Sequence, residues 1–241
     1  MRILILSDIH ANLVALDAVL AATADARIDQ LWCLGDTVGY GPNPNECVTL
    51  VQQHAAVALA GNHDWGALEK VSRREFNPQA QAALRWTGEQ LTDSSREWLT
   101  ALSGREDQVH PAFTLAHASP RDPIWEYILD AEIAAQNFRH FETRLALVGH
   151  THQPAIFRKD VEDDLVAGYY PMPNHPIDLG HDEGVRFIIN PGSVGQPRDH
   201  DPRAAYAIFD DERATLTFHR QPYDIAGTQR RMAQAGLPDR L

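Results

Sequence analysis

The sequence predicts an α/β fold built around a mixed sheet assembly. Three patterns support this prediction: a buried apolar run at residues 2–6, alternating strand-like and helix-like segments as far as residue 148, and consecutive strand-like segments from residue 155. The chain has 241 residues, of which 44% are apolar and 22% are charged. This length and composition suit one sizeable core, so we expect a single domain over residues 1–241.

The first part of the chain alternates strands with helices. Residues 2–6 are continuously apolar, as in a buried strand, and apolar residues then recur with helical spacing from Leu13 to Leu20. Further strands are predicted at residues 31–34, 57–60, 113–116 and 145–148. Further helices are predicted at residues 45–53, 65–72, 78–91, 94–102 and 130–141.

The second part contains strands with no strong helix between them until a C-terminal helix. These strands are predicted at residues 155–158, 185–189, 204–209 and 214–220. Residues 160–184 are rich in Asp, Glu, Gly and Pro, which is typical of a long loop or a hairpin insertion. Such a segment could be a lid, a subunit interface or a disordered loop, and the oligomeric state stays open with it.

Composition excludes several classes of protein. A formal net charge of -12 argues against a broad basic surface that grips nucleic acid. The four apolar residues before Ser7 are too few for a secretory signal, and no later segment reaches membrane-spanning length. Cys33 and Cys47 lack the dense pattern of a disulfide scaffold. We therefore expect a cytoplasmic enzyme without a membrane or nucleic-acid partner.

Five short polar motifs each follow a predicted strand. They are Asp8-Ile9-His10, Gly35-Asp36, Gly61-Asn62-His63-Asp64, His117 and Gly149-His150-Thr151-His152. Ligands collect at the carboxyl ends of strands in α/β sheets, so we expect these side chains to share one site. Their oxygen and nitrogen donors, with no cysteine among them, suit divalent Mn, Fe, Zn or Co.

The spacing within the motifs indicates how the metal would be held. Side chains at i and i+2 of an extended chain point the same way, so Asp8 and His10 are expected to reach one metal together, as are His150 and His152. Asp36 stands alone and is the best candidate to bridge two ions. Two divalent ions outweigh these carboxylates, so the site would attract a phosphate and activate water for ester hydrolysis.

The motif order D-x-H, G-D, G-N-H-D, isolated His and G-H-T-H resembles that of the calcineurin-like metallophosphoesterases over residues 8–152. Residues 190–199, with the sequence NPGSVGQPRD, are similar to a segment of the small bacterial phosphodiesterase-like branch. The resemblance implies a four-layer α/β/β/α sandwich. It also implies two divalent ions, with manganese as the expected occupant and Fe, Zn, Co or Ni as alternatives.

The resemblance assigns the ligands and one catalytic residue. The first metal would be held by Asp8, His10, Asp36 and His152. The second would be held by Asp36, Asn62, His117 and His150. His63 would point away from the metals into the cleft, where it would bind phosphate or protonate the leaving oxygen.

One motif departs from the serine/threonine phosphatases of the superfamily. Those proteins continue the second motif as G-D-x-V-D-R-G, whereas this chain has Gly39 and Tyr40 in place of the aspartate and arginine. The aspartate orients the histidine equivalent to His63, and the arginine binds phosphate. Protein phosphatase activity is therefore not expected, and Asp64 or another nearby carboxylate is the candidate to orient His63.

Three residues near the motifs are candidate substrate contacts: Asn12, Tyr40 and Arg198. Asn12 would equally well cap the helix that follows it. Tyr40 could stack on a nucleobase or aryl leaving group, although core packing explains most aromatic residues. Arg198 suits bidentate phosphate contact and lies in a glycine-containing turn.

The expected function is dinuclear, metal-dependent hydrolysis of small phosphodiesters or phosphomonoesters, nucleotides among them, by attack of a metal-bound hydroxide. A small phosphate ester is thus the expected partner. The alternative is a non-catalytic metal-binding scaffold of the same fold that engages other proteins, as the retromer subunit does. A nuclease is a third candidate, which the acidic composition disfavours. The complete ligand set favours the enzyme.

Overall fold

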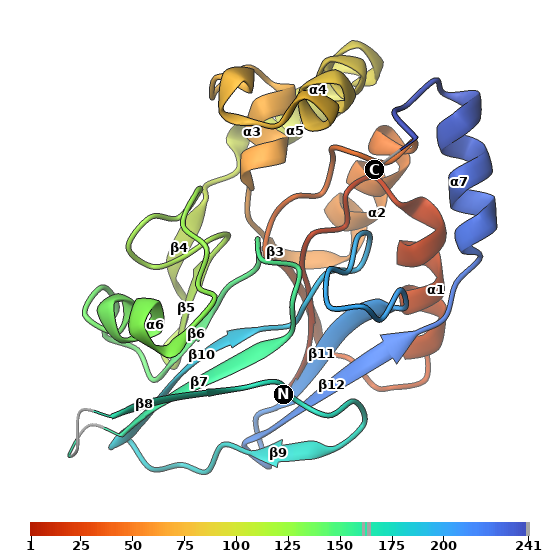
Figure 1. Cartoon of the computed structure of the whole chain (residues 1–241). Helices are drawn as coiled ribbons and strands as arrows, with labels where there is room; N and C mark the ends of the chain where they lie inside the picture. Colours follow the sequence, from red (N-terminus) through yellow and green to blue (C-terminus); the bar gives the residue numbers. More distant parts are fainter. Residues whose placement is uncertain (161, 163–164, 240–241) are drawn as a thin grey trace.

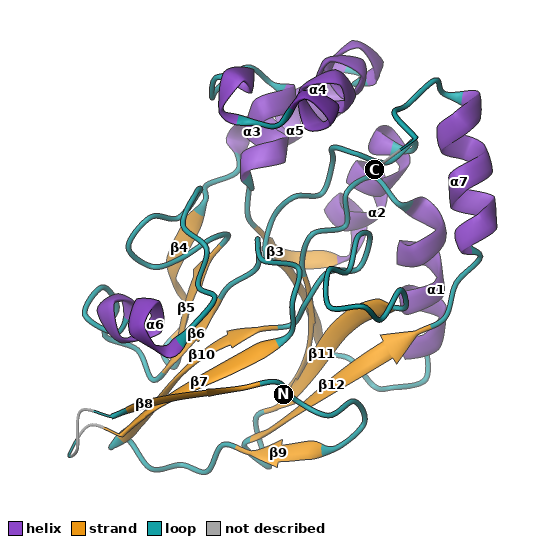
Figure 2. Ribbon diagram, in the orientation of Figure 1, coloured by secondary structure: helices purple, strands orange, loops and turns teal. Residues whose placement is uncertain are grey.

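The computed structural model describes residues 1–160, 162 and 165–239, in which two six-stranded sheets pack face to face (Figure 1). The strand order is β3-β2-β1-β11-β12-β9 in the first sheet and β4-β5-β6-β10-β7-β8 in the second. Helices cover the outer face of each sheet (Figure 2). The predicted four-layer α/β/β/α sandwich is confirmed.

The strands that matter for the site run in parallel. The first sheet contains β1 (Arg2–Leu6), β2 (Gln30–Cys33), β3 (Ala55–Ala58), β9 (Pro176–Asp178), β11 (Ala204–Asp210) and β12 (Thr215–Gln221). The second contains β4 (Arg105–His110), β5 (Phe113–Ala116), β6 (Leu145–Leu147), β7 (Ala155–Asp160), β8 (Val166–Tyr169) and β10 (Val185–Asn190). In the first sheet β1, β2 and β3 are parallel, and in the second β5, β6 and β10 are parallel.

The helices form three groups. Against the first sheet lie α1 (Leu13–Thr23) and α2 (Pro44–His54), and α7 (Ile225–Gln234) packs beside α1. Against the second sheet lies α6 (Ala131–Asn137). Beyond the strand ends gather α3 (Asn62–Ala67), the 3-10 turn η1 (Arg73–Glu75), α4 (Pro78–Gln90) and α5 (Asp93–Ala101), as Figure 1 shows. None of these helices has the length and apolar character needed to cross a bilayer.

The main core lies between the two sheets. Ile3 and Ile5 of β1 face this core, while Leu4 and Leu6 face the helices. Both faces of β1 are therefore buried, which is why its sequence is apolar throughout rather than alternating. Trp32 and Phe113 meet edge to face across the sheets with ring centroids 5.1 Å apart. Burial of side chains of this size contributes roughly 1.5–3 kcal/mol each, so this core fixes the two sheets relative to each other.

Several element boundaries differ from the prediction. The strand β4 was not predicted, because residues 105–110 (REDQVH) carry mostly polar side chains. It forms a sheet edge, where strands tolerate charge. The helix predicted at residues 65–72 is instead α3, which begins at Asn62 because the Asp64 carboxylate accepts a hydrogen bond from the Gly61 N–H, 2.9 Å away. The strand predicted at 57–60 begins at Ala55.

The 160–184 insertion contains two short strands. β8 pairs with β7 as an antiparallel hairpin, and β9 then joins the edge of the other sheet beside β12. Of the predicted alternatives, a hairpin thus describes the first half of the insertion. Residues 161, 163 and 164 of this segment lie outside the described residues.

Candidate metal centre

The seven predicted ligands lie together at the carboxyl ends of five strands from both sheets. Each of their residues is 3% exposed or less. The strands are β1, β2 and β3 of the first sheet and β5 and β6 of the second. The ligand residues are Asp8, His10, Asp36, Asn62, His117, His150 and His152. Their chemistry therefore depends on how the two sheets are packed.

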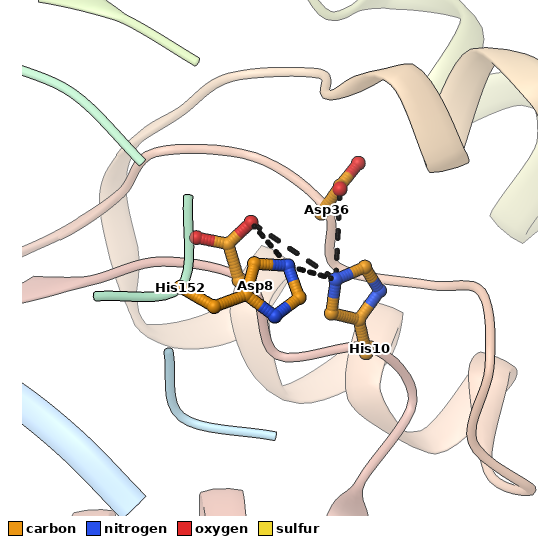
Figure 3. A group of neighbouring side chains, drawn as sticks. All are labelled: Asp8, His10, Asp36 and His152. Carbon is orange, nitrogen blue, oxygen red and sulfur yellow. Dashed lines mark hydrogen bonds and ion pairs between the residues drawn. The ribbon is translucent and has the colours of Figure 1, made fainter. Parts of the chain in front are cut away.

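Asp8, His10, Asp36 and His152 form the first group of potential ligands, as shown in Figure 3. The Nε2 atoms of His10 and His152 are 3.0 Å apart. An Asp8 carboxylate oxygen lies 3.4 Å from His152 Nε2, and an Asp36 oxygen lies 3.6 Å from His10 Nε2. Four donor atoms at these separations surround a point that one cation can occupy.

Asp36, His117 and His150 form the second group. The Asp36 oxygen that approaches His10 also lies 3.5 Å from His117 Nε2. Asn62 adds an amide oxygen 3.3 Å from the same His117 nitrogen. Asp36 belongs to both groups, as a bridging ligand would. His150 and His152, although only two residues apart, fall into different groups.

Backbone carbonyls orient three of the histidines from behind. The Nδ1 atoms of His10, His117 and His152 lie 3.3, 2.9 and 2.6 Å from the carbonyl oxygens of Val38, Leu34 and Gln196, respectively. A proton on Nδ1 that is donated to such a carbonyl leaves the Nε2 lone pair free to bind a cation. The three rings are thus held in the tautomer that a metal requires.

Two buried polar atoms indicate that this donor set fits a cation. One carboxylate oxygen of Asp36 and Nε2 of His150 are buried without a hydrogen-bond partner. An unpaired buried polar group costs about 1–3 kcal/mol, and a bound cation would satisfy both atoms. Burial also raises the pKa of Asp8 to about 7 and lowers the pKa of His10, His150 and His152 well below the ordinary value. These histidines are accordingly neutral, the form that binds metals.

The backbone at these residues is not extended. The expectation that side chains at i and i+2 share a metal assumed an extended chain. Asp8, His10 and Asp36 have φ values of 53°, 50° and 52°, and His150 and His152 have 66° and 61°. These values lie in the left-handed region that non-glycine residues rarely adopt. The side chains therefore converge through tight loop turns, and strand alternation does not explain why they share a site.

Two residues that the sequence did not single out for a role fix these turns. Asn190 Nδ2 donates to the Gly149 carbonyl at 2.6 Å and lies 3.0 Å from Thr151 Oγ1, which holds the last motif in place. Ser193 Oγ donates to the Asp8 carbonyl at 2.8 Å. Both residues belong to the segment 190–199, which resembles the small bacterial branch of the family. That resemblance marked the segment as important but assigned no role to either side chain.

His63 lies beside the first group but is not oriented by Asp64. The Asp64 carboxylate accepts hydrogen bonds from the backbone N–H groups of Gly61, Thr37 and Val38. The expectation that Asp64 orients His63 is therefore wrong, because its oxygens are engaged elsewhere. Ring contacts fix His63 instead, with centroids 4.3 Å from Tyr40, 4.8 Å from His10 and 5.0 Å from Phe76.

The packing of His63 explains why this chain has Gly39 where the serine/threonine phosphatases have an aspartate. Gly39 has φ of +90°, and a Cβ atom there would lie 2.7 Å from His63 Nδ1. An aspartate at this position would strain the backbone and displace the ring. Burial, together with the charge of Arg198, lowers the pKa of His63 well below its ordinary value, so the ring is neutral and can donate one N–H.

The structure places the three candidate substrate contacts differently. Asn12 caps α1, because its Oδ1 accepts a hydrogen bond from the Ala15 N–H at 3.2 Å. Arg198 lies over the Tyr40 ring, 5.9 Å from its centroid, and donates to Gln196 Oε1 at 2.8 Å. Its charge acts on the carboxyl groups of Asp8 and Asp36, whose pKa values it lowers in opposition to the dominant effect of burial. Tyr40 and Arg198 thus both border the ligand groups.

Tyr127 also contacts the site. Its ring stacks on His150 with centroids 4.1 Å apart and an interplanar angle of 22°. In the sequence, Tyr127 is one of several aromatic residues that follow motif segments and could stack on a nucleobase or aryl leaving group, with core packing as the commoner role. Its stacking on His150 was not predicted.

Comparison with known proteins gives consistent results. The sequence model described as the calcineurin-like phosphoesterase superfamily domain matches residues 1–214. The crystal structure of a metallophosphoesterase from Sphaerobacter thermophilus superposes with a TM-score of 0.88 at 49% identity, covering 99% of this chain and 96% of that one.

Curated relatives extend over nearly the same length. An uncharacterized protein of Methanocaldococcus jannaschii is 36% identical over 242 residues, which cover 99% of this chain and 95% of the relative. The phosphodiesterase YfcE of Escherichia coli is 24% identical over 212 residues, covering 88% of this chain and 89% of YfcE. With the buried Asp and His cluster at the strand ends, these matches show that the chain belongs to the calcineurin-like phosphoesterase superfamily.

Proposed function

We propose that this protein is a dinuclear metal-dependent phosphoesterase that hydrolyses small phosphodiesters or phosphomonoesters. The observation that carries the proposal is the sharing of Asp36 by two groups of buried donors, which together use all seven predicted ligands. Two divalent cations bound there, manganese in the first instance, would supply the positive charge and the activated water that hydrolysis of a phosphate ester needs.

His63 and Arg198 perform the remaining steps in this proposal. His63 borders the first group, and its neutral ring donates an N–H to a phosphate or leaving-group oxygen. The Arg198 guanidinium binds the phosphate and takes the place of the arginine that Tyr40 replaces in the second motif. The Tyr40 ring, over which the guanidinium lies, and the Gln196 side chain, which accepts its hydrogen bond, position this group.

The charge distribution supports a small substrate rather than a nucleic acid. The chain carries a formal net charge of -12, so a long polyanion would meet net repulsion. A small phosphate ester is attracted only by the local positive charge of the site. Cys33 and Cys47 are both free and buried, which supports the proposed cytoplasmic location.

Metal-stripped protein tests the proposal directly. Treatment with a chelator should abolish hydrolysis, and added Mn²⁺ should restore it. A comparison of p-nitrophenyl phosphate with bis(p-nitrophenyl) phosphate, repeated with Mn²⁺, Fe²⁺, Zn²⁺, Co²⁺ and Ni²⁺, then separates monoesterase from diesterase activity and ranks the metals. Metal uptake without turnover of either compound would instead support the non-catalytic scaffold.

A further inference from the structure

A small cavity opens beside the first ligand group, next to His10 and Tyr40. Its volume is about 170 Å³. The opposite wall consists of Tyr223 and of Ile225, Thr228 and Met232 from α7. This helix lies outside residues 1–214, the part of the chain that the superfamily model matches. The wall therefore lies outside the matched segment, although the Sphaerobacter thermophilus structure and the Methanocaldococcus jannaschii relative each cover 99% of this chain.

Asn12 joins this wall to the ligand loop. Its Oδ1 accepts a hydrogen bond from Thr228 Oγ1 at 3.1 Å, and its Nδ2 donates to the Gly195 carbonyl at 2.9 Å. The same Nδ2 lies 3.4 Å from the Tyr223 hydroxyl. Asn12 is two residues beyond His10, so α7 is fixed relative to the ligands. Figure 1 shows α7 lying alongside α1 at this end of the sandwich.

The cavity lining suits an uncharged ligand. Its described lining residues include no Lys, Arg, Asp or Glu. Pro197, Ile225 and Met232 supply apolar surface. An ionised group would lose its hydration here without gaining a partner of opposite charge, whereas an apolar ring would be stabilised by leaving water.

The size and position of the cavity restrict the ligand further. An apolar cavity of about 150 Å³ is known to bind benzene, so about 170 Å³ holds one ring. The cavity begins at His10, a ligand of the first group, so a group that enters it must be attached directly to the bound phosphate. The lining also contains polar side chains, but those of Asn12 and Thr228 already hydrogen-bond to each other, and Gln196 accepts a hydrogen bond from Arg198. A flat ring that packs between Tyr40 and the apolar residues Ile225 and Met232 therefore suits this cavity.

We infer that this cavity binds an uncharged aromatic ring joined to the phosphate through an ester oxygen, and that α7 thereby makes the enzyme selective for aryl esters. This inference rests on the proposed function, because the phosphate must be held by the metal-loaded site.

Isothermal titration calorimetry with non-hydrolysable phosphonates tests the inference. The Mn²⁺-loaded protein should bind phenylphosphonate at least about tenfold more tightly than methylphosphonate, because the ring leaves water. It should bind 4-carboxyphenylphosphonate less tightly than phenylphosphonate. Met232→Trp fills the cavity and should bring phenyl and methyl affinities to within about twofold. The matched variant Ala233→Trp, on the exposed side of the same helix, should keep the wild-type preference.

A second variant controls for misfolding of Met232→Trp. Met232→Ala introduces a smaller side chain that cannot clash, and it should reduce the preference for phenylphosphonate over methylphosphonate several-fold. Equal, metal-dependent binding of methyl- and phenylphosphonate, or an unchanged preference in Met232→Trp, would overturn the aryl subsite while leaving the proposed function intact. If neither phosphonate binds more tightly with Mn²⁺ than without it, the proposed function fails as well.

Discussion

Backbone strain is concentrated at the proposed metal ligands. Asp8, His10, Asp36, His150 and His152 all adopt left-handed conformations. Such conformations cost of order 1–3 kcal/mol each and persist where the surrounding structure enforces them. Here Asn190 and Ser193 supply hydrogen bonds that hold two of the turns. The ligands are therefore pre-organised by the protein rather than gathered by the metal.

Asp36→Asn tests the shared ligand. The amide keeps the shape of the side chain. Its oxygen can still accept the hydrogen bond from the backbone N–H of His63, which is 2.8 Å long in the wild type. We expect bound manganese to fall from two ions to one or none, and hydrolysis to fall at least about 1,000-fold. Metal analysis of the purified variant and steady-state kinetics measure both effects.

The metal-free stability of this variant separates ligation from folding. Burial raises the pKa of Asp36 well above its ordinary value, so its charge is unfavourable in the metal-free protein. Metal-free Asp36→Asn should consequently unfold at the wild-type temperature or above it. Asp25→Asn, an exposed control, should leave metal content and turnover unchanged. Full manganese occupancy in Asp36→Asn would contradict the assignment of Asp36 as the bridging ligand.

His63→Ala distinguishes two roles of His63: hydrogen-bond donation to the leaving oxygen and binding of the phosphate. Donation of an N–H to the leaving oxygen matters most when that oxygen departs with a high pKa. The variant should therefore slow hydrolysis of an alkyl ester at least about tenfold more than hydrolysis of a p-nitrophenyl ester. A uniform rise in KM for both esters, with kcat unchanged, would restrict His63 to phosphate binding.

At the scale of elements, the sequence predicted the strands that end at the motifs better than the edges of the sheets. The inner strands β1, β5 and β6 are buried on both faces, so they appear as apolar runs. The edge strands β4 and β8 are largely polar or exposed and depend on pairing with distant neighbours. The gathering of the motif side chains at one end of the sheets was predictable, because each motif follows a predicted strand. The close packing of Gly39 against His63 was not predictable, because it depends on contacts between separate loops.

The segment between β5 and α6 positions the second ligand group through Glu126. The Glu126 carboxylate accepts hydrogen bonds from Ser119 Oγ at 2.6 Å and Asn137 Nδ2 at 2.8 Å, and it pairs with Arg121. Next to it, the Tyr127 ring stacks on the His150 ring with centroids 4.1 Å apart. Glu126 thus anchors the loop that supports this histidine.

Glu126→Gln should destabilise the fold by about 1–3 kcal/mol at neutral pH, because it removes the charge from these hydrogen bonds. Burial raises the pKa of Glu126, but hydrogen bonds from Arg121, Ser119 and Asn137 outweigh it and leave the value at about 2, below the ordinary 4.5. Stabilisation by the charged form is thus complete above pH 4.5 and is lost as the pH falls toward 2.

Urea unfolding of both proteins from pH 7 to pH 3 measures this effect. The difference in unfolding free energy should be constant above pH 4.5 and shrink below it. Glu132→Gln, an exposed control in α6, should show little difference at any pH. A difference for Glu126→Gln that persists unchanged to pH 3 would show that the charge of Glu126 is not what anchors the loop.

At the scale of the whole molecule, the proposed metal ligands come from both sheets. Asp8 and Asp36 follow strands of the first sheet, while His117, His150 and His152 follow strands of the second. Cations bound among them would join the two halves of the sandwich at the end where five loops meet. In the absence of metal, hydrophobic contacts such as that between Trp32 and Phe113 hold the sheets together.

Manganese should therefore raise the thermal stability of the entire fold. A ligand present at about 100 times its Kd stabilises the native state by about 2.7 kcal/mol. For a chain of this size that corresponds to a rise in Tm of roughly 5–10 °C. Differential scanning calorimetry of chelator-treated protein, with and without Mn²⁺, should show one transition that moves upward as a whole. Because Asp36→Asn removes the shared ligand, its Tm should rise much less, and an equal rise in both proteins would place the stabilising manganese outside this centre.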